Sequence, residues 1–215
     1  MARTTKKSHE DSLSAANGTR EKLLRAALHV FAEKGFSDAT TREIANRAEV
    51  FQPQIAYFFS SKLALWKEIV ESVIPLSNAM LDPLLEDRGQ DSKIRIARLV
   101  RNYLTFAAQH PEWIGIVIRG GLTNDETSDW LITKYLRPRS EKIYRAMTGR
   151  SLAQAGAAEA RVALSVLSIL SGAIATFPQA AYAQGIAEVE VDSHAFLEDH
   201  IRLVTAAINA VIEVS

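Results

Sequence analysis

The stretch TREIANRAEVFQPQIAYFF, residues 41–59, decides the fold that the sequence predicts. Hydroxyls near Thr40 can cap a short helix over residues 42–48, and a second short helix follows over about residues 52–59. About four residues join the two, which is the spacing of a helix-turn-helix. Ile55 and Phe59 lie one turn apart and would bury one face of the second helix against the first.

The opposite face of this second helix carries polar and aromatic side chains, namely Gln52, Gln54, Tyr57 and Phe58. An amide group can donate and accept hydrogen bonds at a base edge, whereas a tyrosine hydroxyl or the Lys62 ammonium suits a phosphate. Two short amphipathic helices also occur in bundles that bind no nucleic acid. The residues of this motif therefore leave both interpretations open.

Helical periodicity continues along the rest of the chain, and alternating strand patterns are absent from the sequence. A first helix is expected from Thr19, with a stop at Gly35. Further helices are predicted over residues 62–86, 91–109, 111–121, 125–147 with a break at Pro138, 157–184 and 193–214. The sequence thus predicts an all-α protein in three parts: a disordered arm over 1–18, a three-helix domain with a helix-turn-helix over 19–65, and a helical bundle over 66–215.

Composition excludes several function classes. The chain of 215 residues has no cysteine, so disulfides, zinc fingers and cysteine nucleophiles are ruled out. None of the common catalytic motifs occurs, which predicts a protein that is not an enzyme and needs no cofactor or metal. Residues 1–62 hold 10 basic and 7 acidic side chains, and the remainder holds 15 and 18, so the amino-terminal part is mildly basic.

One segment is long and apolar enough to raise the question of a membrane. Residues 162–182 contain no charged side chain, but they include serine, threonine, proline and glutamine and lack a flanking basic cluster. A buried helix in a core or dimer interface is the expectation, in a cytoplasmic protein without a membrane partner.

Residues 19–66, TREKLLRAALHVFAEKGFSDATTREIANRAEVFQPQIAYFFSSKLALW, resemble the DNA-binding domain of the TetR family of transcriptional regulators. The likeness runs through the AALHVFAEKGF helix end, the ATTREIANRA helix and the closing YFFSSKLAL. HPEW at 110–113 is similar to a common feature of that family's ligand-binding domain.

The resemblance implies a set of DNA contacts. Phosphate contacts would come from the start of the second helix, and base contacts from the start of the third. Tyr57 and Lys62 would bind the backbone, and Phe58 stands where the family often has His or Tyr. The complete expected set is Thr40, Thr41, Arg42, Gln52, Pro53, Gln54, Tyr57, Phe58 and Lys62.

Three further positions depart from the family pattern. Glu49 stands where glycine is usual, at a position expected to need a positive φ, which costs a glutamate roughly 1 kcal/mol. Phe51 replaces a Ser/Thr cap, and Ala56 replaces an aromatic phosphate contact. These departures put the exact contact list in doubt rather than DNA binding itself.

For the body of the protein the resemblance implies ligand binding and dimerisation. Each of the last two helices has an apolar seam, which could pair with a second copy in a four-helix bundle or form only an intramolecular core. The seams are Ala163, Leu167, Leu170, Ile174 and Phe177 in one helix, and Ile201, Val204, Ala207, Ile208, Val211 and Ile212 in the other.

Aromatic and aliphatic side chains could line an effector pocket in this body, although each could equally be plain core. The candidates are Tyr103, Phe106, Trp113, Ile116, Val117, Arg119, Trp130 and Phe177, with Arg119 able to meet an anionic ligand. The prediction is a repressor that binds double-stranded palindromic operator DNA as a homodimer and is released by a small apolar or amphipathic effector. The alternatives are a DNA-bound protein-interaction factor without an inducer, and an enzyme of unrecognised type.

Overall fold

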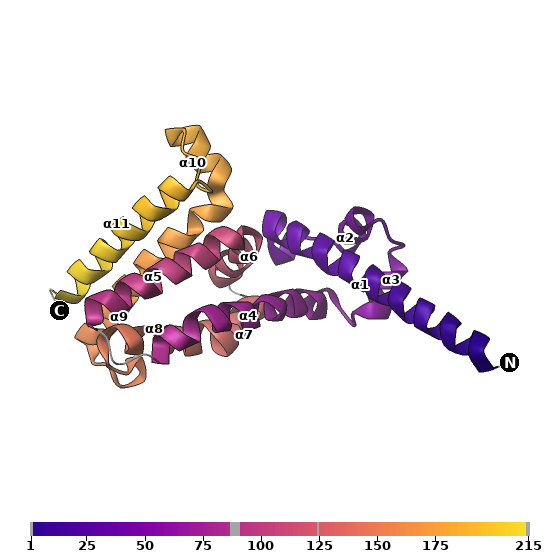
Figure 1. Cartoon of the computed structure of the whole chain (residues 1–215), viewed down its shortest axis with the longest axis horizontal. Coiled ribbons are helices and arrows are strands. Elements are labelled where there is room, and N and C mark those ends of the chain that lie inside the picture. Colours follow the sequence, from indigo (N-terminus) through magenta and orange to yellow (C-terminus); the bar gives the residue numbers. More distant parts are fainter. Residues whose placement is uncertain (1, 87–90, 124, 214–215) are drawn as a thin grey trace. The chain divides into compact units, whose positions relative to one another are not determined.

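The computed structural model describes residues 2–86, 91–123 and 125–213, and gives only the backbone for residues 2–16, 80–81, 83–86 and 121–122. Within these ranges every regular element is helical and no strand occurs, as the sequence predicts (Figure 1). The chain divides into two compact units, Met1–Ser72 and Val73–Ser215. The division falls inside a long helix, seven residues after the domain limit expected from the sequence.

The first unit contains the helices α1 (Ala2–Asp38), α2 (Thr41–Ala48) and α3 (Pro53–Phe58), and the start of α4 (Lys62–Glu86). Gly35 interrupts α1 with a φ of 78°, a conformation that glycine adopts without steric cost.

Helix α1 extends back to Ala2, whereas the sequence predicts a start near Thr19. No proline precedes Thr19, and alanine and lysine favour the helix, so local sequence offers little to stop it there. The side chains of residues 2–16 lie outside the described residues. Solvation of the 1–18 arm therefore stays a prediction.

Aromatic packing closes the core of the first unit. Phe36 stacks on Phe31 and meets Trp66 edge-on, each with ring centroids 6.1 Å apart. Because Trp66 is fully buried, the first turns of α4 belong to this core, which explains why the division lies beyond residue 65. The other fully buried large side chains of the unit are Phe31, Leu23, Ile44 and Leu65.

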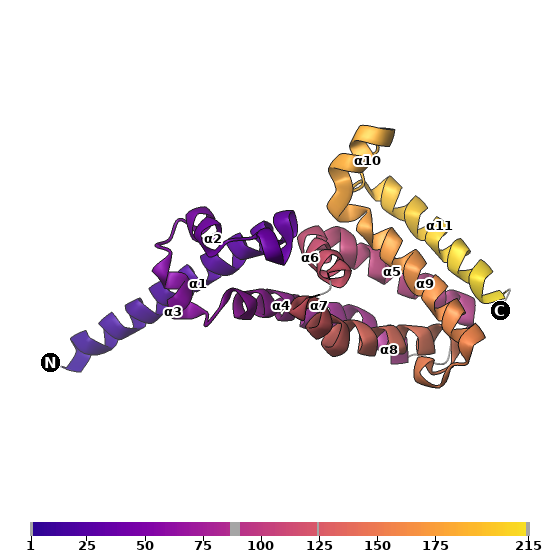
Figure 2. The same cartoon turned by 180° about the vertical axis from the view of Figure 1, so that it is seen from behind.

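The second unit is a bundle built around α5, which packs against both α9 and α11 (Figures 1 and 2). Its helices are the part of α4 that follows Ser72, and α5 (Ser92–Gln109), α6 (Pro111–Leu122), α7 (Glu126–Leu131), α8 (Arg137–Thr148), α9 (Ala157–Ala175), α10 (Ala180–Ala187) and α11 (His194–Glu213). Side chains of Asp91 and Asp125 accept hydrogen bonds from the first amides of α5 and α7, which caps both helices.

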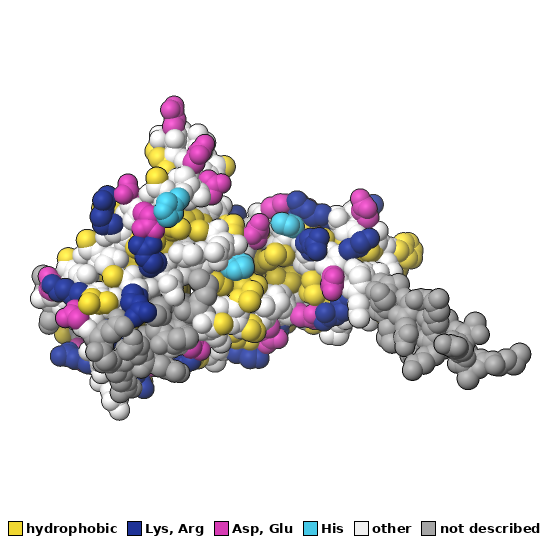
Figure 3. All heavy atoms as spheres, viewed as in Figure 1, with side chains coloured by type: hydrophobic (Ala, Val, Ile, Leu, Met, Phe, Trp, Pro, Cys, Tyr) yellow, Lys and Arg dark blue, Asp and Glu magenta, His cyan; other side chains and the backbone are white. Residues whose placement is uncertain are grey.

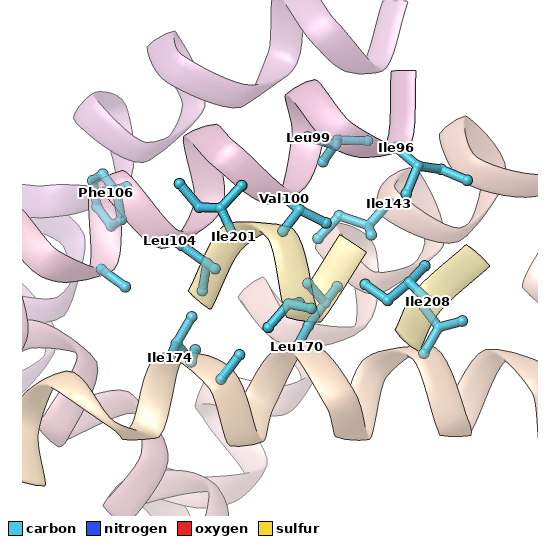
Figure 4. Close-up of a cluster of buried hydrophobic side chains, with 14 of the residues drawn as sticks. Ile96, Leu99, Val100, Leu104, Phe106, Ile143, Leu170, Ile174, Ile201 and Ile208 are labelled. Carbon is cyan, nitrogen blue, oxygen red and sulfur yellow. The ribbon is translucent and has the colours of Figure 1, made fainter. Parts of the chain in front are cut away.

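The core of this unit is aliphatic (Figure 4). Four helices contribute its main members: Ile96, Leu99, Val100 and Leu104 from α5, Ile143 from α8, Leu170 and Ile174 from α9, and Ile201 and Ile208 from α11. Several residues of the expected dimer seams are thus used inside one chain. The seams predicted for a partner are in large part an intramolecular core.

Two prolines change the helix geometry in different ways. Before Pro138 the chain makes a π-helical turn over Ile132–Leu136 instead of the expected break, because a wider turn accommodates a residue that lacks an N–H. At Pro178 the predicted helix over 157–184 is interrupted by a 3-10 turn, Phe177–Gln179.

By length and composition one described segment, Ala157–Ala187, could cross a membrane, and 33% of its most apolar window is buried in the fold. A core helix of a soluble protein passes the same test. Buried Val166, Leu170 and Ile174 show that α9 contributes to the core.

Candidate nucleic-acid interface

The turn between α2 and α3 depends on one left-handed residue. Thr40 caps α2 by accepting a hydrogen bond from the Glu43 amide at 3.2 Å. Glu49 then adopts φ 57° and ψ 42°, and its amide and that of Val50 return to α2 carbonyls at 3.2 and 3.0 Å. The positive φ expected at Glu49 is present. A non-glycine residue pays roughly 1–2 kcal/mol for it.

The start of α3 is fixed by its own glutamines. The Phe51 amide donates to Oε1 of Gln54 at 3.1 Å, which is half of a capping box with the usual Ser/Thr replaced. Nε2 of Gln52 donates to Oγ1 of Thr41 at 3.4 Å. Pro53 stands in the first turn, where no amide hydrogen is needed. The side-chain amides of Gln52 and Gln54, which are the candidates for base contacts, are therefore both held in place by hydrogen bonds.

Helix α3 separates a buried face from an exposed one. Ile55 and Phe59 are each 4% exposed and anchor the helix, as the sequence predicts. On the other side Tyr57 is 80% exposed, and its ring meets Phe58 edge-on at 5.0 Å. The outward surface of α3 is thus aromatic and polar, with no acidic side chain in the helix.

Four of the nine predicted DNA contacts border one hollow of about 290 Å³: Thr41, Gln52, Pro53 and Lys62. Ala56 also lines it, together with Ser60 and Ser61, and Ser61 caps α4 by accepting from the Ala64 amide at 3.0 Å. The amino-terminal ends of α2 and α4 both border the hollow. Helix amino termini carry partial positive charge, so this surface suits a phosphate.

Lys62 has hydrogen-bond partners that could not be predicted from the sequence. Its Nζ donates to the carbonyl oxygens of Phe36 at 2.8 Å, Ala39 at 3.0 Å and Ser37 at 3.3 Å. It also lies 4.4 Å from the centre of the Phe36 ring. An ammonium group has three donors, and all three are used here. The structure places Lys62 as a tie between α4 and the end of α1, and its phosphate contact stays a prediction.

Ion pairs neutralise several basic side chains of this unit. Arg47 pairs with Glu33 and Lys34 with Glu43, each at 2.7 Å, and Arg20 pairs with Glu68. The hydrogen bond from Arg47 lowers the pKa of Glu33. On the face shown in Figure 3 the two charge signs are interspersed.

Arg42 differs from these basic residues. It is exposed in the second position of α2, and no ion pair engages it within the described part of the chain. It is the one arginine in the predicted contact set, and its side chain is open to a phosphate or a base.

Phe51 is absent from the predicted set of DNA contacts, but its exposure makes it a further candidate. It is 76% exposed and lies two residues before Pro53, the first residue of α3, and its amide donates to the Gln54 side chain. An aromatic side chain at the head of a recognition helix can contact a thymine methyl group. The signal in the sequence was the replacement of a Ser/Thr cap by a residue that cannot cap.

The predicted effector residues fall into two groups in the second unit. Phe106 and Phe177 are buried in the core, where Tyr103 and Trp113 pack against them, and the Phe106 and Trp113 rings meet at 5.7 Å. The others lie outside that cluster: Ile116 and Val117 are buried, Trp130 is partly buried and Arg119 is exposed.

A hollow of about 680 Å³ opens elsewhere in this unit, and none of the predicted effector residues lines it. Its wall includes Tyr144, Arg150, Arg161 and Val211, from the ends of α8, α9 and α11 and the loop after α8.

Comparison with known proteins matches the first unit most directly. Residues 23–69 fit the family model described as bacterial regulatory proteins, tetR family. A probable HTH-type transcriptional regulator, YttP of Bacillus subtilis, is 28% identical over 102 residues, which cover 47% of this chain and 49% of that protein. The HTH-type transcriptional repressor NicS of Pseudomonas putida is 26% identical over 137 residues, covering 64% and 59%. The chain therefore spans about half the length of the curated relatives it matches.

Solved structures share the fold over most of the chain. A TetR-like transcriptional regulator from Rhodococcus sp. RHA1 aligns with a TM-score of 0.68 at 17% identity, over 88% of this chain and 93% of that one. FadR of Bacillus subtilis, solved with stearoyl-CoA, aligns with a TM-score of 0.61 at 13% identity, over 87% and 98%. At these identities the likeness concerns the fold.

Proposed function

Because this chain belongs to the TetR family of bacterial regulatory proteins, we propose that it represses transcription from a palindromic operator, which it binds as a homodimer and leaves when a small effector binds. We propose repression rather than activation because repression is the usual behaviour of the family. A protein that acts on bacterial DNA works in the cytoplasm.

The observation that carries this proposal is the preformed head of α3. Gln52 and Gln54 are held at its first turn by hydrogen bonds, and Phe51 and Tyr57 stand exposed beside them. A recognition helix of this kind enters the major groove with its first residues at the base edges. Arg42 and the hollow at Thr41 would then meet phosphates on the flanking backbone.

Dimerisation is supported by surfaces that the core does not use. Leu164 on α9 and Leu203 on α11 are 65% and 64% exposed. Each is followed along its helix by exposed small residues, Ser168 and Gly172 on α9 and Ala206 and Ala210 on α11. Small residues let helices approach closely, and α9 and α11 already pack together. Two such pairs would form an isologous four-helix interface.

Release by an effector requires that the ligand bind the DNA-incompetent state more tightly than the competent one. The eight predicted pocket residues remain candidates for this site. A DNA-bound interaction factor would instead keep its operator affinity whatever compound fills the second unit.

Selection of binding sites from random duplex DNA tests the proposal. We expect an inverted repeat with half-sites about one helical turn apart. Gln54→Ala should change the preferred sequence, whereas Arg42→Ala should weaken all sequences similarly and reduce the salt slope by about one. Arg137→Ala, an exposed arginine on α8, serves as the control.

The outcomes distinguish an effector-released repressor from a DNA-bound interaction factor. Selection that enriches no inverted repeat, or identical behaviour of the two head variants, contradicts the operator proposal. A compound that stabilises the protein strongly but leaves operator affinity unchanged favours the interaction factor.

A further inference from the structure

Arg139 lies on the inward side of α8. Ile143, four residues later, is buried, and so are Ala146 and Met147 in the following turn. Residues four apart share a face of a helix, so Arg139 continues this buried stripe. Figure 4 shows Ile143 among the core side chains next to Ile96 and Val100.

The hydrogen-bond partners of Arg139 are uncharged. Nη1 donates to Oδ1 of Asn78 at 2.7 Å, and Nη2 donates to the carbonyl of Ser77 at 3.2 Å, both on α4. The side chain of Ser77 is only 5% exposed, so α4 also has a polar position in its buried face. Nε of Arg139 is buried and has no hydrogen-bond partner in the structure.

A partly buried guanidinium without a bound carboxylate is costly, because it loses part of its hydration and gains no opposite charge in contact. Burial accordingly lowers the pKa of Arg139, although arginine stays protonated. The carboxylate of Asp82 is near enough to raise that pKa in part, but it is itself 3.4 Å from Nζ of Lys142. Among the described residues no acidic side chain forms a salt bridge with Arg139.

Tyr103 on α5 supplies a second donor in the same region. Helix α5 packs against α8, and Tyr103 packs against the core cluster that contains Ile143. Arg139 and Tyr103 influence each other electrostatically, and burial raises the pKa of the Tyr103 hydroxyl. The side chain nevertheless keeps part of its surface accessible. No hydrogen bond engages this hydroxyl within the described part of the chain.

The backbone is also unusual here. The π-helical turn Ile132–Leu136 ends just before Arg139 and alters the direction in which α8 presents its first residues. Such turns occur frequently at functional sites.

We propose that Arg139 and Tyr103 recognise the anionic head group of an amphipathic effector, whose tail packs against the apolar side chains of the second unit. The free Nε–H and the phenolic O–H are both donors, and an arginine hydrogen bond to a carboxylate or phosphate is charge-assisted. The inference rests on the proposed function, in which the second unit binds a small molecule. Carboxylate and phosphate heads share this chemistry, so the test includes both.

Octanoate, octyl phosphate and octanol are suitable probes, because they share one tail and differ in the head. Binding to the full-length protein is measured by isothermal titration and thermal shift. We expect both anions to bind at least tenfold more tightly than octanol. Arg139→Gln and Tyr103→Phe should each remove most of that preference, whereas Arg137→Gln, an exposed arginine on the same helix, should keep it.

Tyr103→Phe keeps the ring and loses only the hydroxyl, so it remains informative if Arg139→Gln fails to fold. Equal binding of the three probes, absence of binding by either anion, or full anion preference in Tyr103→Phe would each overturn the proposal. Operator titration with the bound anion is a separate readout. If the anion binds through Arg139 but leaves operator affinity unchanged, this inference stands and the release mechanism fails.

Discussion

Replacing Lys62 by methionine distinguishes a structural tie from a phosphate contact. Methionine preserves most of the aliphatic stem but removes the three hydrogen bonds to the carbonyls of Phe36, Ser37 and Ala39. A net 0.5–1.5 kcal/mol for each bond gives an upper sum of about 4.5 kcal/mol. Lys62 is only partly buried, so water replaces some of this, and we expect a loss of about 2 kcal/mol.

The assay combines thermal unfolding with operator titration over a range of salt concentrations. A structural tie predicts a lower unfolding midpoint and a salt slope close to that of the wild type. A phosphate contact predicts an unchanged midpoint and a slope reduced by about one. Lys22→Met is the matched control, because Lys22 is an exposed lysine on α1 of the same unit.

The tie would be refuted by an unchanged midpoint together with a reduced slope. That result would mean that the ammonium leaves its three carbonyls for a phosphate when DNA binds, at little cost to the folded unit.

Other changes test separate parts of the molecule. Glu49→Gly should stabilise the first unit by about 1 kcal/mol by relieving the left-handed conformation, whereas Glu49→Gln removes only the charge and should not; equal unfolding midpoints of the two variants would contradict the strain argument. Hydrogen bonds from the Thr127 side chain and from the Thr127 and Ser128 amides lower the pKa of Asp125, so its stabilisation is present above the ordinary carboxyl pKa and is lost as the pH falls through the lowered value. Asp125→Ala should therefore cost about 1 kcal/mol at neutral pH and little in acid, and unfolding curves that differ equally at both pH values would exclude this. Phe51→Ala should weaken binding to operators with thymine at the contacted step more than to others, as measured by competition. Light scattering should return about twice the chain mass of 23.7 kDa, and a monomer at micromolar concentration would contradict the dimer.

The helix-turn-helix could be predicted because its determinants are local. The Thr40 cap, the left-handed Glu49 and the buried pair Ile55 and Phe59 all depend on residues within about one turn of each other. Local backbone preference and side-chain spacing carry this information directly.

The partners of Lys62 could not be predicted in this way. Its three carbonyl acceptors lie 23 to 26 residues earlier in the chain and meet it only after α1 and α4 have packed. A lysine at the head of a helix looks the same in sequence whether it faces DNA or a neighbouring loop.

The predicted dimer seams show a similar limit of prediction from sequence. Periodicity identifies an apolar face of α9 and α11 but not its partner, and Leu170 and Ile208 turned out to face the core of their own chain. The exposed face of α9 is instead the less apolar stripe formed by Leu164, Ser168 and Gly172.

Arg139 adds a geometric reason why the proposed effector site is hard to predict from sequence. Counting 3.6 residues per turn from the start of α7 assigns each side chain to a face, but the π-helical turn at Ile132–Leu136 inserts about one extra residue per turn. Every later position is then displaced by roughly 100° around the axis. A helical wheel drawn through residues 126–147 therefore places Arg139 on the wrong face relative to α7. The four-residue spacing between Arg139 and Ile143 remains valid, because both lie in α8. Arg139 is recognised as part of the buried stripe only when helix faces are counted from Arg137, the first residue of α8.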